Sequence, residues 1–219
     1  MQEFLDNLPV FEEAIRQTFF IVFVSLGVGG VLGLLLGLVL YATRREGLLP
    51  NRAVYLVVNV LVNVVRPIPF VIFLVAIQPL MLATIGTTIG TGAVTFALSL
   101  SAAFAVSRIV EQNLVTVDPG VVEAARAAGA RPLGILLTVV IPEALGPLIL
   151  GYTFMFVAIV DASALAGLFG GGGLGDFAIT YGSQRYNWPI VYISLAAIVV
   201  LVQAGQFLGN WLARRALRR

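Results

Sequence analysis

The chain carries long stretches without a single charged residue, and this spacing of charges limits its fold more than any other feature. No Asp, Glu, Lys or Arg occurs between Arg16 and Arg44. A hydrocarbon core about 30 Å thick needs about 20 apolar helical residues. The uncharged stretches predict spans at 17–41, 53–79, 93–110, 145–168 and 188–212. The predicted fold class is therefore an all-α membrane protein with five transmembrane helices in a single domain, 1–219.

Two of the connections have a recognisable composition. The second apolar stretch is interrupted by Arg66-Pro67-Ile68-Pro69. The polar string at 83–92, rich in Thr and Gly, then predicts a turn before the third span.

Composition excludes several classes of function. Only 11% of the residues are charged, against about a quarter in soluble proteins. Cys and His are absent, so disulfides, thiolate metal sites and imidazole ligands are excluded. Lys is absent as well, so the chain has no P-loop and hydrolyses no ATP by that motif. The arginines are dispersed along the chain, which argues against a nucleic-acid partner.

The distribution of arginines predicts how the chain is oriented. Loops rich in Arg face the cytoplasm in membrane proteins. Arginines gather between the first two spans, after the third span and at the C-terminal end: Arg44, Arg45, Arg52, Arg126, Arg131, Arg214, Arg215, Arg218 and Arg219. The N-terminal segment is acidic, with Glu3, Asp6, Glu12 and Glu13 against Arg16. We therefore expect the N-terminus outside and the C-terminus in the cytoplasm.

The first span has a small residue at every fourth position, namely Ser25, Gly29, Gly33 and Gly37. Such a stripe lets a second helix approach closely and gain dispersion contacts. Packing within the chain is the favoured interpretation, and a seam between two copies is the alternative.

A short polar helix is predicted on the cytoplasmic side, within a region at about 114–142. Asp118 is a good N-cap, Pro119 suits the first helical position, and Gly129 suits the C-terminal end. Alanines leave little bulk on its surface, so a groove on another protein can close around it. Pro142 is expected to break the chain before the fourth span. An ordinary amphipathic loop is the alternative.

The spacing Glu123-Ala124-Ala125, Gly129 and Pro142 resembles the EAA coupling motif of bacterial ABC importer permeases. Over nearly its whole length the chain is similar to the methionine-type (MetI-like) permeases. The segments that carry this similarity are 64–70 (VVRPIPF), 85–90 (IGTTIG), 123–142, 163–167 (SALAG), 172–175 (GGLG) and 181–187 (YGSQRYN).

The resemblance implies a type I ABC importer permease fold and a homodimeric pore in the bacterial inner membrane. Its implied partners are two copies of an ABC ATPase and an extracytoplasmic substrate-binding lipoprotein. ATP and Mg would bind the ATPase, and this chain would bind no cofactor or metal. The implied cargo is an amino acid, D- or L-methionine. The pattern departs from the methionine type at Asp161-Ala162, where Gly-Tyr is expected.

Arg66, Asp161 and Ser163 are the candidate residues of the substrate path. Charged residues inside membrane spans face a bundle interior or a water-filled cavity. We therefore expect Arg66 and Asp161 to be buried. They either contact the carboxylate and ammonium of the substrate or neutralise each other.

The outer end of the fourth span carries candidate gate or docking residues. These are Gly172, Gly173, Gly175, Tyr181 and Asn187. A plain flexible turn is the alternative interpretation of the glycine run at 170–173.

The sequence leaves three other functions open as alternatives. A permease for another amino acid or an osmoprotectant would share the coupling motif. An ion-coupled carrier would use Asp161 as its ion site, but it should show paired repeats, and none is found. A purely structural subunit would not need charges inside its spans.

Overall fold

The computed structural model describes residue 4 and residues 6–217, and within them the regular structure is helical. Glu3, Arg218 and Arg219, which entered the prediction of orientation, lie outside the described residues. The long helices are α2 (Leu8–Thr43), α3 (Arg52–Val65), α6 (Thr91–Val115), α10 (Leu145–Ala166) and α12 (Trp188–Leu217). The short ones are α4 (Phe70–Ala76), α5 (Gln78–Ile85), α7 (Pro119–Ala127), α8 (Pro132–Ile135), α9 (Ile141–Glu143) and α11 (Gly173–Phe177).

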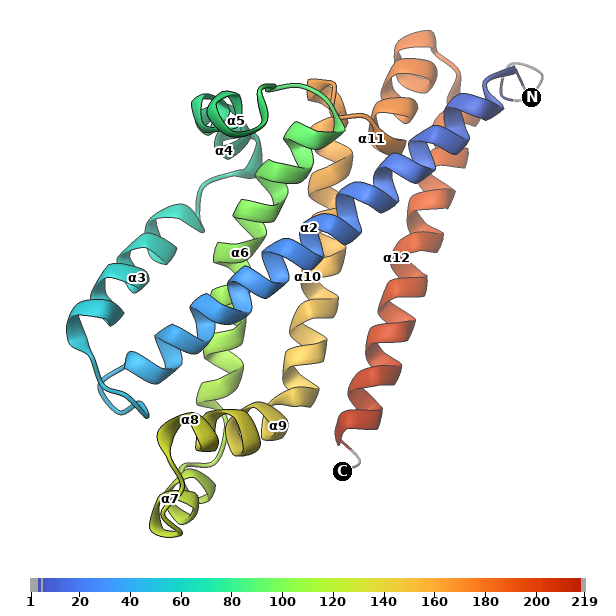
Figure 1. Cartoon of the computed structure of the whole chain (residues 1–219). Helices are drawn as coiled ribbons and strands as arrows, with labels where there is room; N and C mark the ends of the chain where they lie inside the picture. The colour runs from blue at the N-terminus through green and yellow to red at the C-terminus, as the bar shows by residue number, and fades with distance from the viewer. Residues whose placement is uncertain (1–3, 5, 218–219) are drawn as a thin grey trace.

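Four helices are long and apolar enough to cross a membrane unaided: α2, α6, α10 with the turn after it, and α12. The predicted spans at 17–41, 93–110, 145–168 and 188–212 are thereby confirmed. Helix α2 is the longest, and its 36 residues extend for about 54 Å. It crosses the face of the bundle obliquely (Figure 1).

The second predicted span is not one straight helix. Helices α3 and α4 are bent by 109° relative to each other. The cause is the pair Pro67 and Pro69 between them, because proline lacks the N–H group and disfavours the helical conformation of the residue before it. The interruption of the stretch at 53–79, which the sequence indicated at residues 66–69, is therefore confirmed, and α3 and α4 form a broken span. The polar string at 83–92 begins inside α5, which ends at Gly86 with a φ of 74°.

The small-residue stripe of α2 packs against α6 within the same chain. A Cβ added to Gly29 would lie 2.7 Å from the Cβ of Ala102. One added to Gly37 would lie 2.6 Å from the Cβ of Val110. The favoured interpretation, packing within the chain, is confirmed, because α6 already occupies the stripe.

The arginine-bearing loops lie together at one end of the bundle, which we call the arginine-rich end. Figure 1 shows the loop between α2 and α3, the helices α7 to α9 and the C-terminal end of α12 there. The described N-terminal residues and α11 lie at the opposite end.

Pro142 does not interrupt the helix that contains it. An apolar helical segment runs from Pro132 to Glu143, with a π-helical stretch at Leu136–Val140. Pro142 lies in the first turn of α9, where a missing N–H group is tolerated. The chain leaves this segment at Ala144, so the predicted break at Pro142 is corrected to a turn two residues later.

Candidate coupling helix and substrate path

Helix α7 begins and ends at the residues that the sequence indicated. The side chain of Asp118 accepts a hydrogen bond from the Gly120 N–H at 2.8 Å, and Pro119 is the first helical residue. At the other end Gly129 has a φ of 82°, in the left-handed region that favours glycine. These features define a short helix with fixed ends.

The C-terminal end of α7 is a Schellman motif. The Gly129 N–H donates to the Arg126 carbonyl at 2.9 Å, and the Ala130 N–H donates to the Ala125 carbonyl at 3.1 Å. This pair of bonds satisfies the last carbonyls of a helix and requires a left-handed residue between them. Gly129 therefore fixes the direction in which the chain leaves α7.

One face of α7 packs on the protein and the other is exposed. Val122 and Ala125 are partly buried against the apolar core, whereas Glu123 and Ala124 are exposed. The side chain of Glu123 forms no hydrogen bond or ion pair with the described part of the chain. The exposed face thus offers a free carboxylate among small side chains.

A side-chain contact ties α7 to the loop between α2 and α3. Arg126 donates a hydrogen bond from Nη2 to the Gly47 carbonyl at 3.2 Å. The loop is compact at this point, because Gly47 is buried against the carbonyls of Tyr41 and Ala42. Helix α7 therefore has a second attachment to the bundle besides its own chain ends.

The structure places Arg66 and Asp161 on exposed surfaces of the single chain. This corrects the expectation that both are buried. No side-chain hydrogen bond or ion pair joins them to each other or to another described residue. Arg66 is the last residue before the bend between α3 and α4, next to Pro67. Asp161 lies within α10.

Ser163 does not share the exposure of Asp161. It is buried and donates to the Val160 carbonyl of its own helix at 2.7 Å. Its hydroxyl is therefore satisfied locally. Neither this residue nor Arg66 is brought into contact with Asp161 by the fold of one chain.

A small apolar cavity of about 120 Å³ lies between α4, α6 and α10. Phe70 lines it from α4, and Met155 and Ala162 line it from α10. Phe70 follows Arg66 by four residues, across the bend between α3 and α4, and Ala162 follows Asp161. The cavity thus lies between the helix that follows Arg66 in the chain and the helix that carries Asp161.

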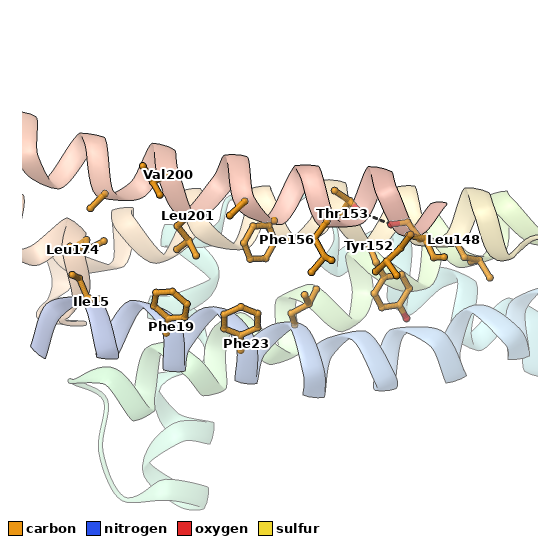
Figure 2. A pocket seen from close by; sticks show the side chains of 18 of the residues that line it. Ile15, Phe19, Phe23, Leu148, Tyr152, Thr153, Phe156, Leu174, Val200 and Leu201 are labelled. Carbon is orange, nitrogen blue, oxygen red and sulfur yellow. Dashed lines mark hydrogen bonds between the residues drawn. The ribbon is translucent and has the colours of Figure 1, made fainter. Parts of the chain in front are cut away.

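A larger groove runs between α2, α10 and α12 and has a volume of about 990 Å³. Figure 2 shows the rings of Phe19, Phe23 and Phe156 directed into it. Its lining is almost wholly apolar. Transfer of a zwitterion into such a groove would cost several kcal/mol for each uncompensated charge, so this groove suits lipid chains and not a polar cargo.

The glycine run after α10 is held tightly against α2. The Gly173 N–H donates to Gln17 Oε1 at 2.8 Å, and the Leu174 N–H donates to Thr18 Oγ1 at 2.8 Å. Gly172 and Gly173 have φ values of 74° and 84°. The close packing argues against the flexible-turn interpretation in this conformation. Gln17 and Thr18 were missed by the sequence analysis, because nothing local links them to residues more than 150 positions away.

Gly175 is packed as closely, because an added Cβ would meet the backbone of Ala164. Tyr181 stacks on Phe177 and carries the Arg185 guanidinium over its ring at 4.6 Å. The Asn187 N–H donates to the Gly182 carbonyl at 2.9 Å and closes this turn. Tyr186, between Arg185 and Asn187 in the chain, is 82% exposed and has a φ of 56°. The opposite end therefore presents an aromatic and cationic surface on a rigid base.

No group of three or more Asp or Glu side chains that could hold a metal ion occurs within residues 6–217.

A family model described as "Binding-protein-dependent transport system inner membrane component" matches residues 29–219. The chain belongs to this family. With its apolar helices it is a multi-pass protein of the inner membrane. The predicted resemblance to importer permeases is confirmed by this match.

Relatives within the family carry more specific names. A Vibrio cholerae protein named "Probable D-methionine transport system permease protein MetI" is 40% identical over 218 residues, which cover 100% of this chain and 97% of the relative. The "Methionine import system permease protein MetP" of Bacillus subtilis is 35% identical over 78% of this chain and 77% of its own length.

Solved structures confirm the fold. A chain of the inward-facing MetNI methionine ABC transporter has a TM-score of 0.92 and 36% sequence identity, and the match covers 96% of this chain and 98% of the other. A chain from an amino acid ABC transporter crystallised with histidines has a TM-score of 0.80 at 23% identity over 97% and 96% of the two chains. The second match shows the fold alone. The predicted type I importer permease fold is confirmed.

Proposed function

We propose that this chain is the membrane-spanning permease of an ATP-driven importer that carries methionine into the cell. The main support is the full-length similarity to a D-methionine permease at 40% identity. Further support comes from α7, a rigid helix whose exposed face carries a free carboxylate. A separate ATPase would dock on that face, and the permease would hydrolyse nothing itself.

The proposed assembly contains two copies of this chain and two copies of the ATPase. Unpaired charges inside membrane spans are costly when they face lipid. Arg66 and Asp161 are exposed in the single chain, so their surfaces belong against a second copy or a water-filled path. The translocation path would then run between the two copies.

The proposed topology places the arginine-rich end in the cytoplasm, following the positive-inside rule. Helix α7 and the coupling region at about 114–142 then meet the ATPase on that side. The opposite end, with Gly172, Gly173, Gly175, Tyr181 and Asn187, faces outward. An extracytoplasmic lipoprotein would release methionine there, against the exposed surface around Tyr186.

Within the path, Arg66 and Asp161 would replace part of the water lost by the amino acid. A guanidinium suits a carboxylate because it donates two parallel hydrogen bonds. Asp161 would accept from the ammonium group. The cavity beside Phe70 and Ala162 has room for a short apolar side chain, since apolar cavities of about 150 Å³ admit benzene. Ser163 contributes only by shaping α10 from its buried side.

The function is tested by uptake into liposomes that contain the permease, its ATPase and the lipoprotein. ATP-dependent accumulation of methionine is expected, with two copies of this chain in the purified complex. A panel of other amino acids and an osmoprotectant such as glycine betaine serves as the comparison. Faster uptake of one of these than of either methionine enantiomer would overturn the methionine assignment. Accumulation without ATP would overturn the ATP-driven mechanism.

Replacement of Asp161 by Asn is expected to lower methionine uptake about tenfold, because a neutral amide loses about one charge-assisted hydrogen bond to the ammonium group. Uptake should be measured against assembled complex, with ATP hydrolysis followed in parallel. Glu143→Asn is the matched control, since Glu143 is also exposed and has no partner but lies at the arginine-rich end. Unchanged rate and substrate preference in Asp161→Asn would show that Asp161 is not a ligand.

A further inference from the structure

A polar cluster joins the broken span to the helix that leads into the coupling region. Arg108 of α6 forms an ion pair with Glu111 one turn later, with Nη1 2.5 Å from Oε2. Its other terminal nitrogen, Nη2, donates to Oδ1 of Asn59 at 2.8 Å and also to Oδ1 of Asn63. The Asn63 amide in turn donates to Asn59 at 3.2 Å. We call these four residues the Arg108 cluster.

The charged pair of the cluster is largely removed from solvent in the single chain, whereas Asn59 is half-buried and Asn63 is exposed. The side chains of Arg108 and Glu111 are only 15% and 7% exposed. Arg108 lies about 10 Å before the end of α6, inside the predicted third span. Buried ion pairs contribute little net stability because of their desolvation cost, and their best-attested use is to fix one relative position of two elements. The ion pair itself lies within α6, and the bonds from Arg108 to Asn59 and Asn63 are the ones that fix α3 relative to α6.

Helix α3 has few other attachments to the bundle. Val62 is its one buried residue. Within the described part of the chain, its side chains form hydrogen bonds to another helix only through Asn59 and Asn63. Without these bonds α3 would be held mainly by loose apolar contacts and by its chain ends.

The same two helices are linked to α7. Residues 116–118 connect α6 directly to α7. Arg126 of α7 holds the Gly47 carbonyl in the loop that leads into α3. Helix α7 is therefore joined to α3 twice, through this loop and through the Arg108 cluster. At its far end α3 reaches the bend with Arg66.

We propose that the Arg108 cluster clamps α3 to α6, so that displacement of α7 by the ATPase moves the bend at 66–69 and the charge of Arg66 with it. This proposal rests on the proposed function. Asn59, Asn63, Arg108 and Glu111 are positioning residues, since none of them contacts the substrate.

The test variant is Asn59→Leu with Asn63→Leu. It removes the two acceptors of Arg108 Nη2, and with them the bonds between the helices, but leaves Arg108 Nη1 paired with Glu111, so the buried charge keeps its ionic partner. Asn210→Leu on α12 is the matched control, because Asn210 is exposed and has no hydrogen bond in the described chain. Asn63→Gln is the conservative variant that keeps an amide within reach of Arg108.

In reconstituted complexes, the double variant should still hydrolyse ATP, but the amount of methionine carried per ATP should fall about tenfold. Asn210→Leu should keep the wild-type ratio of methionine carried to ATP hydrolysed, and Asn63→Gln should retain most of that ratio. A ratio in the double variant within about twofold of wild type would overturn the proposal.

A second measurement needs neither transport nor the Asn59→Leu, Asn63→Leu variant. Spin labels are attached to cysteines introduced in pairs into the otherwise cysteine-free chain, at exposed sites on α3 and α6 (Val57 and Gln112) and on α3 and α10 (Val57 and Leu150). When ATP binds, the α3–α10 distance should change while the α3–α6 distance stays constant. A change of the α3–α6 distance, or an immobile α3, would overturn the clamp. If both distances behave as expected but the wild-type complex takes up no methionine, the result would count against the proposed substrate and not against the clamp.

Discussion

Replacement of Gly33 by Leu is expected to prevent α2 from packing on α6 and to remove most of the folded protein from the membrane. A Cβ at this position would lie 2.5 Å from the Cβ of Val106 and 2.7 Å from the Ala103 carbonyl oxygen. Overpacking costs about 1–3 kcal/mol when side chains can move, and more when the obstacle is backbone. Because α2 makes its largest helix contact with α6, the two helices must separate along much of their length. Folded protein is measured by size-exclusion chromatography of a fluorescent fusion in detergent, with the melting temperature as a second value.

Gly27 provides the matched control on the same helix. A Cβ added to Gly27 has no neighbour within 4 Å. Gly27→Leu should therefore yield folded protein close to the wild-type amount. Equal amounts of folded Gly33→Leu and Gly27→Leu protein would contradict the assigned contact between α2 and α6.

Replacement of Gly129 by Val is expected to abolish methionine uptake and to weaken binding of the ATPase, while the permease still inserts and folds. The left-handed conformation costs an L-residue about 1–2 kcal/mol, and a β-branched side chain tolerates it least. The φ of 82° and both bonds of the Schellman motif would be lost, so α8 would leave α7 in a different direction. The surface that we propose for the ATPase would change shape. Co-purification of the ATPase and uptake per assembled complex are the measurements.

Two variants separate this effect from a general intolerance of the loop. Gly129→Asn should keep much of the activity, because Asn adopts the left-handed conformation more readily than other residues. Gly134→Val should be close to wild type, since Gly134 has an ordinary helical φ and open space around its Cβ. Normal transport by Gly129→Val would remove the coupling role from this position.

Much of the coupling helix could be predicted from local sequence. Asp118 as a cap, Pro119 at the first position and Gly129 beyond the end each act on their immediate neighbours, and all three are confirmed by the structure. The same holds for the four long spans, because the length of an uncharged stretch is read directly against the thickness of the membrane. The role of α7 and its end residues in coupling remains a prediction.

The substrate path was less predictable. The rule that membrane charges avoid lipid led to the expectation that Arg66 and Asp161 are buried, but it does not say which chain buries them. In the single chain both are exposed, and they do not meet. The sequence also gave no sign that Ser163 faces inward on α10 while Asp161 faces outward, because every face of this apolar helix has a similar composition.

The sequence by itself determined the helical membrane fold, the ends of α7 and the small-residue face of α2, since these depend on hydropathy, on backbone conformation and on side-chain size within a few turns. Only the tertiary structure decided that α6 fills that face, that Gln17 and Thr18 hold the glycine run, and that Arg108 joins α3 to α6. These contacts link residues 45 to 156 positions apart. Their partners are chosen by how whole helices pack, and no local pattern of residues records that choice.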